Sequence, residues 1–274
     1  SKANLAGTGA TLVEASILDP AALADALAGA TSVVHLAARP SVPRSIADPV
    51  ASHDANATGT VNVLEAARAT GVGHVVVASS SSVYGANPTL PKSEDLCTMP
   101  VSPYAASKLA TESYALAWQR SFGLGVLAFR FFNVFGPLQP AGHAYAAVVP
   151  AFVDAALAGR PLPVHGDGTQ TRDFTFVGTV AAVLARAATG RIAHDGPVNL
   201  AFGSRVSLLE LIERLEAVLG HPVVREHLPA RVGDVHDSQA DDSRLRGLFP
   251  DLEPTPLDEG LTATVDWFRS LTGR

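Results

Sequence analysis

The sequence predicts an α/β fold in which a doubly wound parallel sheet is joined to a smaller α/β lobe. Segments of strand type and helix type alternate over about the first 135 residues, which is the pattern of such a sheet. The runs at 32–37 (SVVHLA) and 74–78 (HVVVA) are short and apolar, as in strands buried on both faces. With 274 residues, of which 47% are hydrophobic, the chain can bury a sizeable core.

The first half of the chain supplies the expected sheet and the helices that cover it. One helical segment begins at Pro20, and proline is favoured in the first turn of a helix. The expected strands are residues 11–18, 32–37, 74–78 and 126–132, and the expected helices are residues 20–28, 56–69 and 104–122.

The second half is less regular, and Pro and Gly are frequent between its segments, as in a substrate-binding lobe made of loops. We place the first domain at 1–140 and the lobe mainly at 141–274, with residues of about 172–200 returning to the first domain. The lobe's expected elements are helices at 148–157, 208–219 and 257–271, strands near Phe174 and at 198–200, and a loop at 165–171.

Composition excludes several classes of function. Charged residues make up 17% of the chain and the net charge is −6, so we expect no nucleic-acid partner. No apolar run is long enough to span a membrane, and the first residues have no signal-peptide core. The single cysteine, Cys97, permits no internal disulfide, which makes a cytoplasmic location the default. The nine histidines lack metal-ligand spacing, so no metal is expected.

Tyr104 and Lys108 form a YxxxK pattern on the expected helix at 104–122. Residues four apart lie on one face of a helix. A free tyrosine has a pKa of about 10, and a nearby ammonium favours the phenolate and lowers that pKa. The pair therefore suits general acid–base work, although by itself the pattern also fits a surface Tyr and Lys.

A string of serines, SSSSVYG, follows the expected strand at 74–78 directly. It places Ser80 and its neighbours at the carboxyl edge of a parallel strand, where open α/β sheets bind ligands. The hydroxyls and the YxxxK pair together indicate a catalytic site.

The strings SSSSVYG, SPYAASK, RFFNVFGP and GDGTQTRDF resemble the extended short-chain dehydrogenases/reductases, specifically the nucleotide-sugar epimerases and dehydratases. The resemblance covers essentially the whole chain and implies an NAD-binding Rossmann domain. It makes Tyr104 the catalytic base, Lys108 the ligand of the nicotinamide ribose, and Ser80 the assisting hydroxyl. The cofactor-binding residues that it implies are Leu36, Ala37, Ala38, Asn56, Ala78, Ser79, Tyr104, Lys108 and Phe131.

The residues after Ser80 separate two reactions within this family. The related dehydratases carry Asp-Glu after the catalytic Thr, whereas Ser81 and Ser82 stand at those places here. Neither hydroxyl is a competent acid or base near neutral pH. The resemblance therefore favours 4-epimerisation of a UDP-sugar over dehydration.

Substrate contacts are also implied by the resemblance. An arginine fork suits a pyrophosphate, and Arg172 and Arg231 are expected to hold it. Arg130, in the middle of an expected strand, is either a third such arginine or structural. The substrate-binding residues that we expect are Ser41, Ser80, Ser81, Ser82, Tyr104, Asn133, Ala147, Val148, Arg172, Arg231, Asp234 and Ser238.

The sugar is suggested by strings around Ser41, Asn87 and Gln139, which resemble the UDP-N-acetylhexosamine 4-epimerase branch. Ser238 stands where a bulky aromatic narrows the sugar pocket in some epimerases. A serine there leaves room for a 2-acetamido group without requiring it, so UDP-glucose/UDP-galactose and UDP-glucuronate stay open.

The chain departs from the family at its start. The glycine-rich turn that meets the cofactor pyrophosphate does not occur, and the resemblance begins just after the family's second strand. Without that pair of strands, segments 11–18 and 32–37 would leave sheet edges unpaired, so we expect the chain to be part of a longer natural protein. Ser16 also replaces the Asp that the family places near the adenine.

Two alternatives to a 4-epimerase stay open. One is another enzyme of the family, such as a dehydratase, decarboxylase or keto-sugar reductase, and the other is a non-catalytic binding relative. The presence of Ser80, Tyr104 and Lys108 together argues against the second. By analogy with the family, helices 56–69 and 104–122 predict a homodimer.

Overall fold

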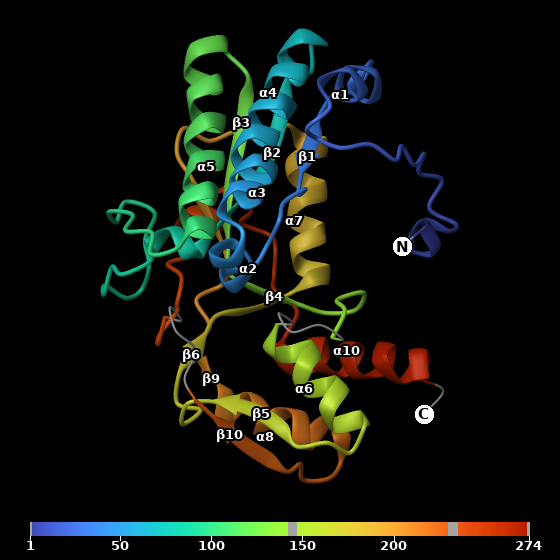
Figure 1. Ribbon diagram of the computed structural model, residues 1–274, viewed down its shortest axis with the longest axis vertical. Helices are drawn as coiled ribbons and strands as arrows, with labels where there is room; N and C mark the ends of the chain where they lie inside the picture. Colours follow the sequence, from blue (N-terminus) through green and yellow to red (C-terminus); the bar gives the residue numbers. More distant parts are fainter. Residues whose placement is uncertain (1, 142–146, 230–234, 273–274) are drawn as a thin grey trace.

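The computed structural model describes residues 2–141, 147–229 and 235–272. A parallel sheet of four strands lies at the centre of the larger part of the molecule, in the order β1-β2-β3-β8 (Figure 1). Its strands are β1 (Val33–His35), β2 (His74–Ser80), β3 (Gly125–Phe131) and β8 (Val198–Leu200). The expected parallel sheet is therefore confirmed.

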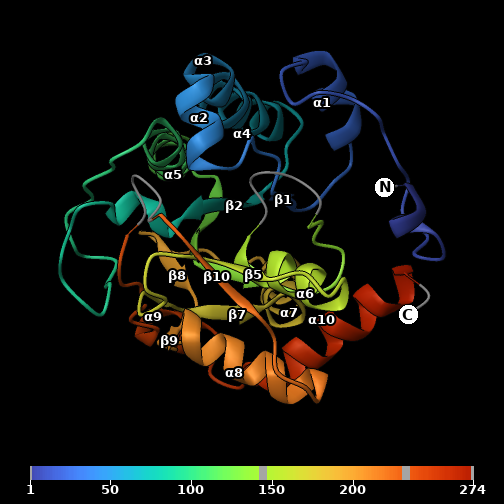
Figure 2. The ribbon, with the colours of Figure 1, turned by 60° about the horizontal axis from the view of Figure 1, so that its bottom comes forward.

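Helices cover both faces of this sheet, and the alternation of side chains along β2 explains why (Figure 2). Val75 and Val77 pack with residues of α4 and α5 on one face, whereas Val76 packs with residues of α7 on the other. A strand with a partner layer on each face is apolar throughout, as the run at 74–78 predicts. The helices are α1 (Pro20–Leu27), α4 (Gly59–Ala69) and α5 (Pro103–Phe122) on one side and α7 (Val177–Gly190) on the other.

Helix α5 begins and ends on clear local signals. The Ser102 hydroxyl accepts a hydrogen bond from the Ala105 N–H at 3.1 Å, and Pro103 occupies the first turn. Gly123 closes the helix in the left-handed conformation, with φ of 72°. These signals place Tyr104 in the first turn, at the carboxyl edge of the sheet.

A smaller lobe has its own apolar core beyond that edge, built from α6, α8, α10 and the strands between them. Helix α8 starts with a capping box, in which Ser207 and Glu210 each bond to the other's backbone N–H. The lobe's elements are α6 (Val148–Leu157), α8 (Leu208–Leu219), α10 (Leu257–Thr272) and the parallel pair β5 (Leu162–His165) and β10 (Arg225–Leu228).

Short elements connect the two parts. Two pairs of strands lie at the junction: β4 (Asn133–Phe135) with β7 (Phe174–Phe176), and β6 (Thr171–Arg172) with β9 (Val206–Ser207). The remaining elements are η1 (Lys2–Leu5), α2 (Val42–Ala47), α3 (Pro49–His53), the π-helical turn η2 (Asp54–Thr58), η3 (Ser81–Tyr84) and α9 (Ser243–Leu248).

The strand expected at 11–18 is wrong. Those residues form no strand, and all but Ile17 are exposed. A strand needs a hydrogen-bonded neighbour, and β2 is the one strand of the described chain that pairs with β1. The apolar run therefore stays outside the sheet. No helix among the described residues is long and apolar enough to cross a membrane.

Candidate active site

Tyr104 and Lys108 lie on the face of α5 that packs against β2. Lys108 is 5% exposed, and its ammonium donates a hydrogen bond to the Ala78 carbonyl at 2.7 Å. The Tyr104 N–H donates to the Ser45 hydroxyl at 3.0 Å, which ties the first turn of α5 to α2. The YxxxK pattern therefore points inward, and the alternative of a surface pair does not hold.

The expected lowering of the Tyr104 pKa is not met. Burial raises the pKa of the phenol, because the phenolate loses its hydration, and a hydrogen bond with Ser80 opposes that rise. The Lys108 ammonium is directed at the Ala78 carbonyl, and burial lowers its pKa to about 8. In this structure Ser80 rather than Lys108 favours the phenolate.

Ser80 ends β2 and caps the short helix η3. Its hydroxyl accepts hydrogen bonds from the Ser82 N–H at 3.2 Å and from the Ser82 hydroxyl at 2.9 Å. The start of η3 therefore holds the Ser80 side chain in place at the strand end.

A buried network behind the pair holds α5 against the sheet. Arg130 is 3% exposed and donates to both carboxylate oxygens of Glu112, at 2.9 and 2.7 Å. The Ser79 hydroxyl donates to the same carboxylate at 2.9 Å. Because Glu112 lies one turn beyond Lys108, this bidentate pair favours the structural interpretation of Arg130. The Ser79 side chain turns toward α5.

Asn56 organises the loop that follows β1. Its amide oxygen accepts from the Arg39 N–H at 2.7 Å, and its amide nitrogen donates to the Arg39 carbonyl at 3.2 Å and to the Ser107 hydroxyl at 2.9 Å. The π-helical turn η2 delivers this side chain, and such turns recur at functional sites. Asn56 therefore joins the expected cofactor loop to α5.

The residues expected to contact the cofactor line one edge of the sheet. Leu36 is 49% exposed and Ala37 is also exposed, while Ala38 is half-buried. Phe131 is half-buried at the end of β3, in register with Ser80. An apolar surface at the carboxyl edge of parallel strands is the usual binding site of a dinucleotide.

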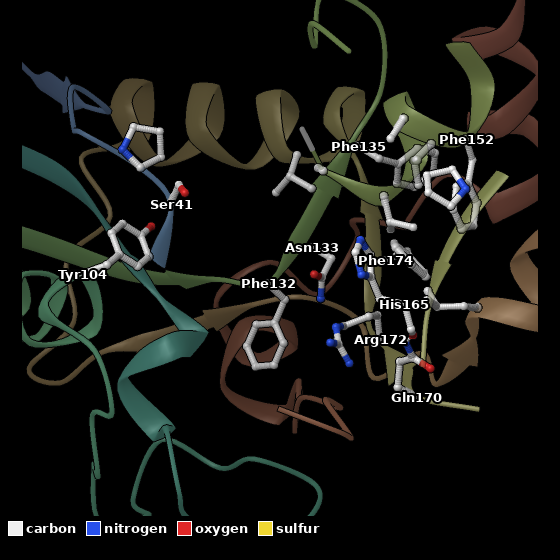
Figure 3. A pocket seen from close by; sticks show the side chains of 18 residues that line it. Ser41, Tyr104, Phe132, Asn133, Phe135, Phe152, His165, Gln170, Arg172 and Phe174 are labelled. Carbon is white, nitrogen blue, oxygen red and sulfur yellow. Dashed lines mark hydrogen bonds between the residues drawn. The ribbon is translucent and has the colours of Figure 1, made fainter. Parts of the chain in front are cut away.

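A cavity of about 470 Å³, here the Tyr104 cavity, lies between the sheet edge and the small lobe. Figure 3 shows Tyr104 and Ser41 on one side of it and Asn133, His165 and Arg172 on the other. Ala147 and Val148, at the start of α6, also line it. Arg172 donates to the Thr171 and His236 carbonyls at 2.8 and 3.0 Å.

A second cavity of about 160 Å³, here the Ser81 cavity, adjoins the first, because both are lined by Phe132, Asn133 and Arg172. It brings Ser81 and Ser82 of η3 next to Ser238. Most of the expected substrate residues thus converge on two joined cavities, while Arg231 and Asp234 lie outside the described residues.

Sequence reasoning missed residues that hold this site together. Asp173 is fully buried and accepts hydrogen bonds from the Ala240 N–H at 3.0 Å and the Ser204 hydroxyl at 2.9 Å. Its carbonyl accepts from the Asn133 N–H at 3.1 Å. Burial raises the pKa of this carboxyl to about 6. The string TRDF, which contains Asp173, could have pointed to this residue, but only its arginine was given a role.

Residues 1–201 match the NAD dependent epimerase/dehydratase family. The chain belongs to this family. It is 40% identical to a UDP-glucose 4-epimerase of Mycolicibacterium smegmatis over 87% of this chain and 76% of that protein. It is 36% identical to a UDP-glucuronate 4-epimerase of Thermodesulfobacterium geofontis over 86% of this chain and 72% of that protein.

Among solved structures, a UDP-N-acetylglucosamine 4-epimerase from Methanobrevibacter ruminantium, in complex with UDP-N-acetylmuramic acid, superposes with a TM-score of 0.90. It is 35% identical, and the match covers 95% of this chain and 83% of that one. This similarity confirms the Rossmann-type α/β fold of a nucleotide-sugar epimerase or dehydratase.

The family is NAD-dependent, and the residues present fit that cofactor. The Lys108 ammonium has three N–H donors and gives one of them to the Ala78 carbonyl, which leaves donors for the hydroxyls of a ribose. The exposed Leu36 side chain would offer the rings of the bound cofactor an apolar surface. Among the described residues, no group of three or more His, Cys, Asp or Glu side chains could hold a metal.

Proposed function

We propose that the protein catalyses 4-epimerisation of a UDP-sugar, UDP-GlcNAc/UDP-GalNAc or UDP-glucose/UDP-galactose, through a transient 4-keto sugar. The observation that carries this proposal is the position of Tyr104 on the wall of the Tyr104 cavity, one helical turn before the buried Lys108, where that cavity adjoins the Ser81 cavity. A general base must lie within hydrogen-bond reach of the proton that it removes, and Tyr104 is the titratable side chain that lies beside the expected ribose ligand Lys108.

The chain's own residues account for the proton movements of this reaction. Tyr104 removes the proton of the sugar 4-hydroxyl and later returns one, and Ser80 stabilises the phenolate through its hydrogen bond. Lys108 binds the nicotinamide ribose from its buried position. Bound NAD supplies reversible acceptance of a hydride. The keto sugar must rotate between the two hydride transfers so that its other face receives the hydride. This rotation needs room, which the two cavities provide together.

Dehydration is disfavoured by the residues next to Ser80. Ser81 and Ser82 line the Ser81 cavity with hydroxyls, which cannot expel water near neutral pH. Asp237 also lines this cavity, but its hydrogen bond with Thr171 and its contacts with His236 and Arg205 hold its pKa well below the usual range. A carboxyl that stays ionised is a poor proton donor.

The sugar is proposed from the size of the pocket. Ser238 lines the Ser81 cavity and leaves space for a 2-acetamido group. The similarity to a UDP-N-acetylglucosamine 4-epimerase supports this substrate, and the similarity to a UDP-glucose 4-epimerase supports the smaller one. A UDP-glucuronate substrate is the second candidate, favoured by the relative that carries that name.

The test is to incubate the NAD-loaded full-length protein with UDP-GlcNAc, UDP-glucose and UDP-glucuronate and to resolve the sugars by NMR. We expect the C4 epimer without net formation of NADH. An unsaturated or deoxy-keto product would replace the proposal with a dehydratase. Absence of turnover with verified bound NAD would replace it with a non-catalytic binding protein.

We also propose a homodimer formed through α4 and α5. Tyr114, Trp118 and Phe122 form an aromatic row along α5, with ring centroids 6.1 and 5.4 Å apart. Tyr114 and Phe122 are exposed, and the guanidinium of Arg68 on α4 lies over the Phe122 ring at 5.3 Å. An exposed row of aromatic side chains on one helix, bordered by an arginine of the next, is typical of a protein interface. Light scattering of Trp118→Lys, expected to be monomeric, tests this contact.

A further inference from the structure

A third cavity, here the Lys92 cavity, has a volume of about 480 Å³ and is lined by the 85–90 loop and residues 235–237. Four residues line both this cavity and the Ser81 cavity: Gly85, Lys92, Val235 and Asp237. Among the described residues it shares none with the Tyr104 cavity. The three cavities therefore lie in the order Tyr104 cavity, Ser81 cavity, Lys92 cavity. The Ser81 cavity thus adjoins further space on the side away from the Tyr104 cavity.

Lys92 is the buried cation on the wall between these two cavities. It is 4% exposed, and its ammonium donates to the Asn87 carbonyl, which belongs to another lining residue. Its backbone is fixed by hydrogen bonds with Gln239 at 2.8 Å and Asp241 at 2.9 Å. Within the described residues no carboxylate lies within ion-pair distance of this ammonium.

Asp237 is the acidic residue on the same wall, and its negative charge is already balanced by a neighbouring arginine. One of its oxygens lies 3.2 Å from the Arg205 guanidinium and also accepts from the Thr171 hydroxyl. Among the described residues, the Lys92 ammonium is thus the charge on this wall that has no counter-ion. An unpaired buried ammonium is unfavourable, and burial lowers the pKa of Lys92 accordingly. A carboxylate in the cavity would relieve that cost.

We propose that the Lys92 cavity is a subsite for a carboxylate carried on an arm of the substrate's sugar, bound by the Lys92 ammonium. The inference rests on the proposed function, because it places the hexose where the Tyr104 cavity and the Ser81 cavity adjoin. An arm is required because the subsite begins beyond the Ser81 cavity. Lys92 is then a specificity-determining residue that selects acidic UDP-hexosamines.

The experiment compares two nucleotides that differ in one such arm. UDP-N-acetylmuramic acid carries a lactic acid ether that UDP-GlcNAc lacks. Their affinities are measured by calorimetry on the NAD-loaded full-length protein with Tyr104→Phe, so that no turnover occurs. We expect the acid to bind about tenfold more tightly, as for a hydrogen bond to a charged group. Lys92→Met should abolish this ratio, and Lys92→Arg should preserve most of it.

Arg186→Met is the matched control, because it removes one positive charge from an exposed position on α7 and should leave the ratio unchanged. Equal affinities, or a ratio that survives Lys92→Met, would overturn the subsite. An equal loss for both nucleotides would also overturn it and assign Lys92 to holding the Asn87 carbonyl. Binding of UDP-GlcNAc without preference for the acid refutes the subsite alone, whereas failure of both to bind refutes the proposed function as well.

Discussion

The two halves of the candidate site are held in different ways. On the sheet side, Tyr104, Lys108 and Glu112 lie on successive turns of α5, each tied by hydrogen bonds to a neighbouring element. On the lobe side, Arg172 and Ser238 lie on a two-residue strand and a loop, joined through backbone contacts with the 236–240 segment. Regular elements fix position more precisely than loops do.

This difference separates chemistry from selection. A proton transfer needs a base within a narrow distance of its target, which a buried helix provides. Recognition of a sugar and its substituents tolerates more variation, and loops change more easily than packed helices. We therefore expect substitutions on the sheet side to alter rate or stability, and substitutions on the lobe side to alter substrate choice.

The largest effect is expected for Tyr104→Phe. Removal of the phenolic oxygen should lower kcat by roughly a thousandfold, in the range of a lost general base. Affinity for the nucleotide sugar should change little, because the lobe supplies most contacts. Steady-state kinetics and calorimetry measure the two quantities, with Tyr114→Phe, exposed on the same helix, as the control. Retained turnover in Tyr104→Phe would remove the assigned base.

Glu112→Gln should have the next largest effect. Breaking a buried ion pair leaves the Arg130 charge uncompensated, and the free energy of unfolding should fall by about 3 kcal/mol. Denaturant titration measures it, and Glu65→Gln, which breaks the exposed pair with Arg68, should have little effect. Equal effects of the two variants would show that the sheet side is no more rigid than the surface.

His35 should make stability depend on pH. Burial lowers the pKa of this imidazole from 6.5 to about 4, so the folded state favours its neutral form. The stability contributed is full above pH 6.5 and is lost as the pH falls toward 4, by roughly 3 kcal/mol. Denaturant titrations at several pH values give the free energy of unfolding as a function of pH. Its slope should be shallower for His35→Gln than for His221→Gln, an exposed control. Identical slopes would contradict the assignment.

The smallest effect is expected on the lobe side. Ser238→Tyr narrows the Ser81 cavity and should reduce kcat/KM for UDP-GlcNAc about tenfold relative to that for UDP-glucose. Competition between the two substrates measures this ratio, and Ser243→Tyr, exposed at the start of α9, should leave it unchanged. A fall in kcat for both sugars alike would mean that the lobe also sets the chemistry.

Much of the fold could be predicted because its signals are local. The helix at 208–219 and the strand at 198–200 match their predicted bounds to the residue, since a capping box marks the start of the helix and a valine and a leucine form the two ends of the strand. The run at 11–18 has the same local character and forms no strand. Its state depends on a neighbouring strand, which periodicity does not reveal.

The sequence by itself determined the α/β class, the positions of Tyr104 and Lys108 on one helix face, and that of Ser80 at a strand end. Spacing along a helix and place along a strand are properties of a few consecutive residues. Only the tertiary structure decided that Lys108 bonds to the Ala78 carbonyl, that Arg130 pairs with Glu112, and that Lys92 lies between two cavities. Each of these joins residues distant in the chain, so burial and charge compensation follow from packing rather than from local pattern.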